Sequence, residues 1–227
     1  MSTKVLSSAI ILAALAATSQ AAVLWDQSAL NWGGNAYPNS ISGAPPFGLT
    51  AYTVCDVNVD AGGWTIDSVS MYFSLINSDW VNDVSQGRLN IFTKTGSLPA
   101  SSDNPGAGTI VPMAATVFFD STVQQNYYKV TAAGLNVTLA PGSYWIGITP
   151  VAPGGFFGPE LGIAAASTIG DYSPYRSPFA DFGSPPANTW ANVSGNQDAA
   201  ILITGVPAPA GLGLLGLAGL AAARRRR

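Results

Sequence analysis

The sequence predicts an all-β protein, an antiparallel β-sandwich of jelly-roll-like topology, and three observations lead to this fold class. Apolar and polar residues alternate with period two in several short runs, as they do in half-buried strands. Turn-forming Gly and Pro separate these runs, and helical periodicity is absent outside the two ends of the chain. Short strands joined by turns favour two packed antiparallel sheets. The jelly roll follows by analogy with other secreted sandwiches of this size.

The first residues, 1–21, have the pattern of a secretory signal peptide. Lys4 forms a short basic region, and the stretch from Val5 to Ala17 is apolar. Ser19-Gln20-Ala21 then places small residues at −3 and −1 of a cleavage site. We therefore expect cleavage between Ala21 and Ala22, and export of the chain through the inner membrane.

Six alternating runs mark the expected strands of the domain, which spans residues 22–205. In the clearest run, four apolar residues from Val69 to Leu75 alternate with serine and tyrosine. Gly62-Gly63 and Pro141-Gly142 are turn signals, and the second suits a type II turn because glycine tolerates a positive φ. Cys55 is the only cysteine, so no intramolecular disulfide forms, and we expect it to be buried. The six runs are 55–59, 69–75, 89–91, 135–139, 144–148 and 199–203.

The C-terminal residues 206–227 combine a proline-rich stretch, an uncharged apolar run and four arginines. As a helix, the run from Val206 to Ala223 reaches roughly 27 Å at about 1.5 Å per residue, close to the hydrocarbon core of about 30 Å. Basic residues that flank a span stay in the cytoplasm, so we expect a single transmembrane helix over 210–223 and cytoplasmic residues 224–227. The two prolines stop helix propagation, so residues 206–209 are expected to be extended, unpaired and accessible to a cleaving enzyme.

The signal peptide and the three-part tail together resemble a PEP-CTERM protein. The resemblance covers the tail and not the domain, and Ala208 takes the position where Glu is usual. It implies that an exosortase-like membrane protease or transpeptidase reads the tail as a sorting signal and that the membrane anchor is transient. It also implies a Gram-negative bacterium that makes extracellular polysaccharide. The sorting motif is then Val206, Pro207, Ala208 and Pro209, and the cytoplasmic stop is Arg224, Arg225, Arg226 and Arg227.

Composition excludes several classes of function. Only 9% of residues are charged, and the domain carries four basic residues against 12 acidic ones, a balance that repels nucleic acid. The chain has no histidine, which removes His-based triads, His metal sites and the commonest general base. Glu160 with Asp79, Asp83 or Asp181 leaves glycoside hydrolysis open in principle, although exposed turns explain these aspartates more simply. We therefore expect no enzyme and no cofactor.

Two loops contain candidate binding residues. The segment from Pro150 to Asp198 is rich in Gly, Pro and aromatic residues, whose rings either stack on sugars or pack as a satellite core. The run 77–83 offers Asp79 and Asp83 as calcium ligands, although Asp is also an ordinary turn residue. The candidate sugar-stacking residues are Tyr172, Tyr175 and Trp190, with Phe179 and Phe182 in the same segment.

Three classes of function stay open from the sequence. The first is an exported, non-enzymatic protein of the cell surface or extracellular matrix, sorted by its tail and associated with exopolysaccharide. The second is a carbohydrate-binding module, for which the aromatic segment is the local support. The third is a secreted glycoside hydrolase, which the missing histidines and the single glutamate argue against.

Overall fold

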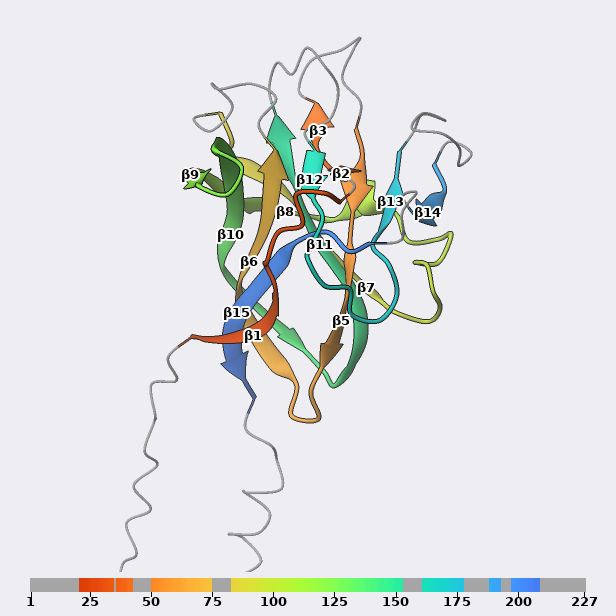
Figure 1. Ribbon diagram of the computed structural model, residues 1–227. Helices are drawn as coiled ribbons and strands as arrows, with labels where there is room; N and C mark the ends of the chain where they lie inside the picture. Colours follow the sequence, from red (N-terminus) through yellow and green to blue (C-terminus); the bar gives the residue numbers. More distant parts are fainter. Residues whose placement is uncertain are drawn as a thin grey trace, which may run out of the picture.

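The computed structural model describes residues 21–34, 36–42, 50–74, 83–152, 161–177, 188–192 and 197–208. These residues form an all-β protein, as predicted (Figure 1). Within these ranges the one helical element is a 3-10 turn, η2 (Pro105–Ala107), and no helix has the length and apolarity needed to cross a bilayer. The predicted transmembrane helix, and the signal peptide up to residue 20, lie outside the described residues.

Two large sheets and one small sheet make up the fold (Figure 1). The seven-stranded sheet has the order β1 (Ala22–Gln27), β15 (Ile201–Pro207), β6 (Trp64–Ser74), β10 (Gln125–Leu139), β9 (Ala114–Asp120). In addition, β12 (Leu161–Ile163) pairs with β6, and β2 (Ala36–Pro38) pairs with β12. The five-stranded sheet has the order β3 (Ile41–Ser42), β11 (Gly142–Ala152), β7 (Gln86–Thr93), β8 (Thr109–Pro112), with β5 (Cys55–Val59) also on β11. The small sheet has the order β14 (Trp190–Asn192), β13 (Pro174–Arg176), β4 (Tyr52–Thr53).

The main pairs are nested along the chain. β1 pairs with β15, β5 with β11, β6 with β10, and β7 with β8, and each pair is antiparallel. The chain is therefore folded like one long hairpin, whose successive pairs fall alternately in the seven-stranded and the five-stranded sheet. The short pair β3–β11 is parallel.

The main core contains inward-facing residues of both large sheets. Met71, Val130 and Ile203 come from the seven-stranded sheet and Ile146 from the five-stranded sheet, and all are fully buried in one cluster. The period-two prediction for the run at 69–75 is confirmed as far as Ser74, where the description stops. Cys55 is buried and free, as predicted, and burial raises the pKa of its thiol.

Two predicted turns carry the chain from one large sheet to the other. Gly63, with φ 79°, lies between β5 and β6, and Pro141 lies between β10 and β11, at the lower end of the view in Figure 1. Gly142 has a positive φ of 151°, instead of the roughly 80° of a type II turn. The turn is where we predicted it, but its geometry differs because it joins strands of two different sheets rather than two paired strands.

The two ends of the domain lie side by side. Ala22, the first residue of β1, is paired with Gly205 of β15. β15 continues beyond the predicted boundary: Val206 pairs with Thr65 of β6, and the Ala208 amide donates a hydrogen bond to the Gly63 carbonyl at 2.9 Å. The expectation that residues 206–209 are unpaired is therefore wrong for the first three of them.

Alternation within the ladder explains why a proline fits in β15. Residues of an antiparallel pair alternate between hydrogen-bonded and non-hydrogen-bonded positions. Because Ala208 donates to Gly63, the neighbouring pair Pro207–Trp64 falls at a non-hydrogen-bonded position, where the missing N–H costs nothing. On its other side, β15 pairs with β1 as far as Ala22, and in the described part of the chain no strand lies opposite Pro207 there.

Candidate functional site

The candidate sugar-stacking residues lie mostly in the interior. Tyr175 is 2% exposed and Trp190 7% exposed, whereas Tyr172 is 37% exposed. Trp190 belongs to a second, smaller hydrophobic cluster; its ring meets Phe92 edge-on at 6.0 Å, and its Nε1 donates to the Asp103 carbonyl at 3.0 Å. This is the satellite-core arrangement that the sequence left as the alternative, and among the three residues only Tyr172 presents much of its ring to solvent.

Of the candidate carboxylates, Asp83 alone lies within the described residues. Asp83 is an exposed turn residue, and Asp79, Glu160 and Asp181 lie outside the described residues. Among the residues that the structure describes, no group of three or more His, Cys, Asp or Glu side chains is placed to hold a metal ion.

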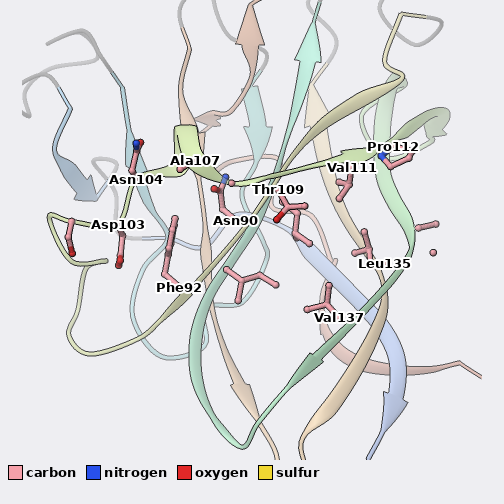
Figure 2. Close-up of a pocket in the computed structure, with 16 residues that line it drawn as sticks. Asn90, Phe92, Asp103, Asn104, Ala107, Thr109, Val111, Pro112, Leu135 and Val137 are labelled. Carbon is pink, nitrogen blue, oxygen red and sulfur yellow. The ribbon is translucent and has the colours of Figure 1, made fainter.

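A groove of about 600 Å³ follows one edge of β7 (Figure 2). β8 pairs with β7 only as far as Leu89–Thr109, so the residues from Asn90 to Thr93 have no strand on that side in the described part of the chain. The loop that contains η2 forms one wall, and residues 133–137 of β10 form the other. The sequence did not predict this groove, because the alternation in β7 marks only Leu89 and Ile91 as core.

A bulge in β10 shapes the second wall. The register between β10 and β6 shifts between Ala133 and Val137, and both Gly134 (φ 68°) and Asn136 (φ 51°) have positive φ. Glycine and asparagine are the residues that adopt this conformation most readily. The bulge bends the strand and brings Leu135 to the groove (Figure 2).

Backbone carbonyls hold the first wall in place. Arg88 Nη1 donates to the Gly108 carbonyl at 2.9 Å, and Arg176 Nη1 donates to the Asp103 carbonyl at 2.6 Å. The Asn104 side chain caps η2 by accepting from the Gly106 amide at 3.1 Å. Both arginine side chains therefore hold the loop of this wall in place.

Asn90 is the most unusual residue of the groove. It is 1% exposed, and neither its Oδ1 nor its Nδ2 has a hydrogen-bond partner among the described residues. Gly108 lies against it, and a β-carbon at Gly108 would collide with Asn90 Oδ1. An unpaired buried polar group costs about 1–3 kcal/mol, so this amide is destabilising unless a molecule in the groove hydrogen-bonds to it.

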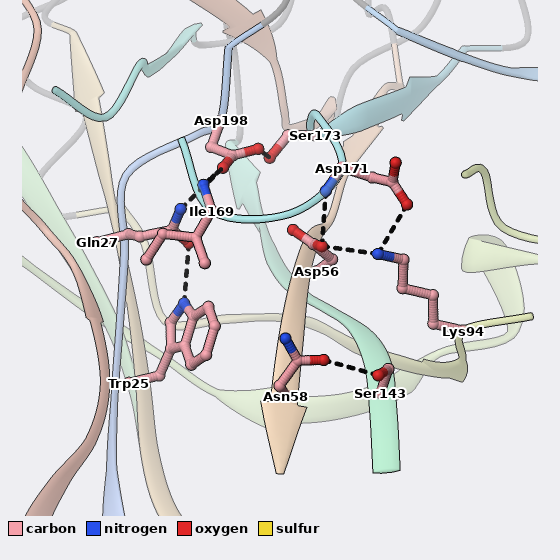
Figure 3. A network of polar contacts seen from close by, with 10 residues as sticks. All are labelled: Trp25, Gln27, Asp56, Asn58, Lys94, Ser143, Ile169, Asp171, Ser173 and Asp198. Atoms are coloured by element: carbon pink, nitrogen blue, oxygen red, sulfur yellow. Dashed lines mark hydrogen bonds and ion pairs between the residues drawn. The ribbon is translucent and has the colours of Figure 1, made fainter. Parts of the chain in front are cut away.

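A separate polar network joins the 169–173 segment to both large sheets (Figure 3). Lys94 Nζ lies 2.7 Å from Asp56 Oδ2 and 2.8 Å from Asp171 Oδ2, and 4.9 Å from the centre of the Trp145 ring. Burial, the largest single effect, lowers the pKa of Lys94, but the hydrogen bonds to Asp171 and Asp56 outweigh it and raise the pKa. Gly170, with φ 79°, is required here because a β-carbon would collide with Asp56 Oδ2.

Asp198 anchors the other half of this network. It is fully buried, and its Oδ2 accepts hydrogen bonds from Gln27 Nε2 and from the Ile169 amide, both at 2.8 Å. Burial raises the pKa of the Asp198 carboxyl, and the hydrogen bonds from Ile169 and Gln27 offset only part of that effect. Most polar atoms of this network bond to one another, which is the pattern of a structural network rather than of an open site.

No protein-family model matches the chain, and comparisons with curated proteins and with solved structures find no match either.

Proposed function

We propose that the chain is an exported, non-enzymatic protein of the cell surface or extracellular matrix, sorted by an exosortase-type system and associated with exopolysaccharide. The observation that carries the proposal is the pairing of Ala22 with Gly205. The two ends of the described domain therefore lie together, which is compatible with a signal peptide and a tail span that enter one membrane. The domain then lies wholly on the outer side, with Arg224 to Arg227 held in the cytoplasm.

We also propose that the domain is a jelly-roll-like β-sandwich. The nested pairing of β1 with β15, β5 with β11, β6 with β10 and β7 with β8 supports this topology. So does the main core, which combines inward-facing residues of both large sheets.

The pairing of the last residues of β15 limits where the tail can be cut. Val206 to Ala208 are bound to β6 and to Gly63, so a cleaving enzyme cannot bind them as an extended substrate while the strand is in place. We therefore expect the cut after Ala208 and before Leu212.

Replacing Arg224 to Arg227 tests the sorting step in cells. With all four residues changed to Ser, the span loses its cytoplasmic stop, and the fraction of chains that lack the tail falls. With the same four changed to Lys, the charge remains and processing stays at the parental level. Equal processing of the Ser and Lys variants would contradict the proposal.

A second candidate function, a carbohydrate-binding module, is favoured by the groove along β7. The groove combines apolar walls with an unpartnered amide, which is the usual composition of a small-ligand site.

A further inference from the structure

We infer that the groove along β7 binds a neutral glycan, with Asn90 as its central hydrogen-bonding residue. The inference rests on the proposed association with extracellular polysaccharide and names the residues that would carry it. They differ from Tyr172, Tyr175 and Trp190, the residues that the sequence suggested.

The charged groups in and near the groove favour a neutral ligand over an anionic one. Among the described residues that line the groove, Asp103 is the one charged side chain. The nearby guanidinium groups of Arg88 and Arg176 donate to the backbone carbonyls of Gly108 and Asp103. A phosphate or a uronic acid would therefore meet a carboxylate in the groove and no lining cation, an unfavourable arrangement for an anion.

The lining alternates apolar surface with neutral polar groups. Ile91, Phe92, Leu135 and Val137 supply carbon surface, and Figure 2 shows Phe92 on one side of β7 with Leu135 and Val137 on the other. A pyranose ring has the matching composition, with C–H faces that pack on apolar side chains and hydroxyls at its rim. The volume of about 600 Å³ falls within the usual range of ligand sites. The neutral polar groups are the side chains of Asn90, Ser102, Asn104 and Thr109.

Asn90 fits a sugar hydroxyl in particular. A hydroxyl both donates and accepts, and the unpartnered amide offers one acceptor oxygen and one donor nitrogen. Asn90 also sits on a strand that pairs with β11 through Gly147, so its position is rigid before the ligand arrives. Binding therefore satisfies a buried amide without an ordering cost for the side chain.

An extended peptide that adds to the free edge of β7 is the competing occupant. Strand addition depends on backbone hydrogen bonds along the edge and makes no use of the Asn90 side chain. The two occupants are therefore separated by a variant that removes the amide and leaves the backbone unchanged.

The test uses the full chain in mild detergent, titrated with soluble mannan, galactan and β-glucan as neutral probes and polygalacturonate as the acidic one. At least one neutral polysaccharide binds, and Asn90→Leu weakens its affinity by about tenfold or more. The melting temperature does not fall, because an apolar side chain of similar size replaces an unpaired buried amide. Asn58→Leu, the same change on an exposed position of β5 at the opposite edge of the sheet, binds like the parent.

Thr109→Val provides a second variant that does not disturb the interior, because Thr109 is exposed at the groove. It weakens binding of the same neutral polysaccharide and leaves the melting temperature unchanged. The inference is overturned if no neutral probe binds, or if polygalacturonate binds best. Unchanged binding by Asn90→Leu and Thr109→Val, or a peptide that binds both variants like the parent, overturns it equally. Any of these results leaves the sorting proposal intact, because tail processing is measured in cells without a glycan.

Discussion

At Lys94 a single ammonium group forms ion pairs with two carboxylates of unequal exposure. The Asp56 side chain is 3% exposed, and that of Asp171 is 42% exposed. A buried carboxylate is costly without an opposite charge, so the value of this ion pair lies in Asp56 rather than in the exposed partner.

Lys94→Met leaves the Asp56 carboxylate buried without a counter-charge. We expect the free energy of unfolding to fall by about 3 kcal/mol, as for other broken buried pairs. Urea denaturation measures the change. Lys129→Met is the control, since the Lys129 ammonium contacts the Tyr72 ring at 5.9 Å and has no ion pair with any described residue. An equally large loss in both variants would show that the buried pair has no special role.

The raised pKa of Asp198 makes the free energy of unfolding depend on pH. Its pKa is raised in the folded state, mainly by burial, so the folded chain binds this proton more tightly than the unfolded chain. The stabilising contribution is therefore complete below the ordinary value of 3.8 and is lost as the pH rises through the raised folded value. Relative to Asp198→Asn, the parent loses stability as the pH rises above about 4 in urea titrations. A constant difference between the two across this range would contradict the account.

At the scale of the elements, Gly63 allows the turn that joins the two large sheets. Its φ is 79°, and a β-carbon there would lie 2.6 Å from the Leu139 carbonyl oxygen. Gly134 has a similar φ of 68° but open space around its Cα. An alanine at Gly134 therefore measures the cost of the positive φ alone, without a collision.

We expect Gly63→Ala to destabilise the protein more than Gly134→Ala. A left-handed alanine costs about 1–2 kcal/mol on its own, and only Gly63→Ala adds the collision with Leu139. Guanidinium denaturation of the two variants measures the difference. Equal midpoints would mean that the turn at Gly63 moves enough to remove the collision with Leu139.

β14 pairs with β13 and contributes Trp190 to the smaller hydrophobic cluster. Trp190→Ala removes a buried indole and its hydrogen bond to Asp103, so we expect a loss of about 3 kcal/mol or more in unfolding free energy. Tyr172→Ala, at a 37% exposed ring, changes stability little. If Trp190→Ala leaves the melting temperature at the parental value, the ring is not part of the core.

At the scale of the whole molecule, the sequence predicted which faces are buried better than which strands are neighbours. The alternation at Val69 and Met71 marks residues that are fully buried, and the turn at Gly62-Gly63 was correctly located. The alternation of apolar and polar residues shows which face of a strand packs against the core. It does not show which strand lies next to it in the sheet. The crossing from β10 to β11 at Pro141 could not be predicted for that reason.

The groove and the paired tail escaped prediction for related reasons. Asn90 alternates with core residues, and from the sequence it is indistinguishable from a solvent-facing strand position. Its burial follows from the loop that contains η2, which connects β7 to β8 and folds back against β7. From the sequence, residues 206–209 are expected to be unpaired, and only the register against Trp64 shows that the missing N–H of Pro207 is tolerated in β15.

The central claim is that the domain, with both ends on one side, is exported and then released from a temporary anchor. Mass spectrometry of the mature protein tests it most directly. The account predicts an N-terminus at Ala22 and no peptide from Leu212 to Arg227. A mature protein that still carries Arg224 to Arg227 and remains in the inner membrane would contradict it, because the tail would then be a permanent anchor.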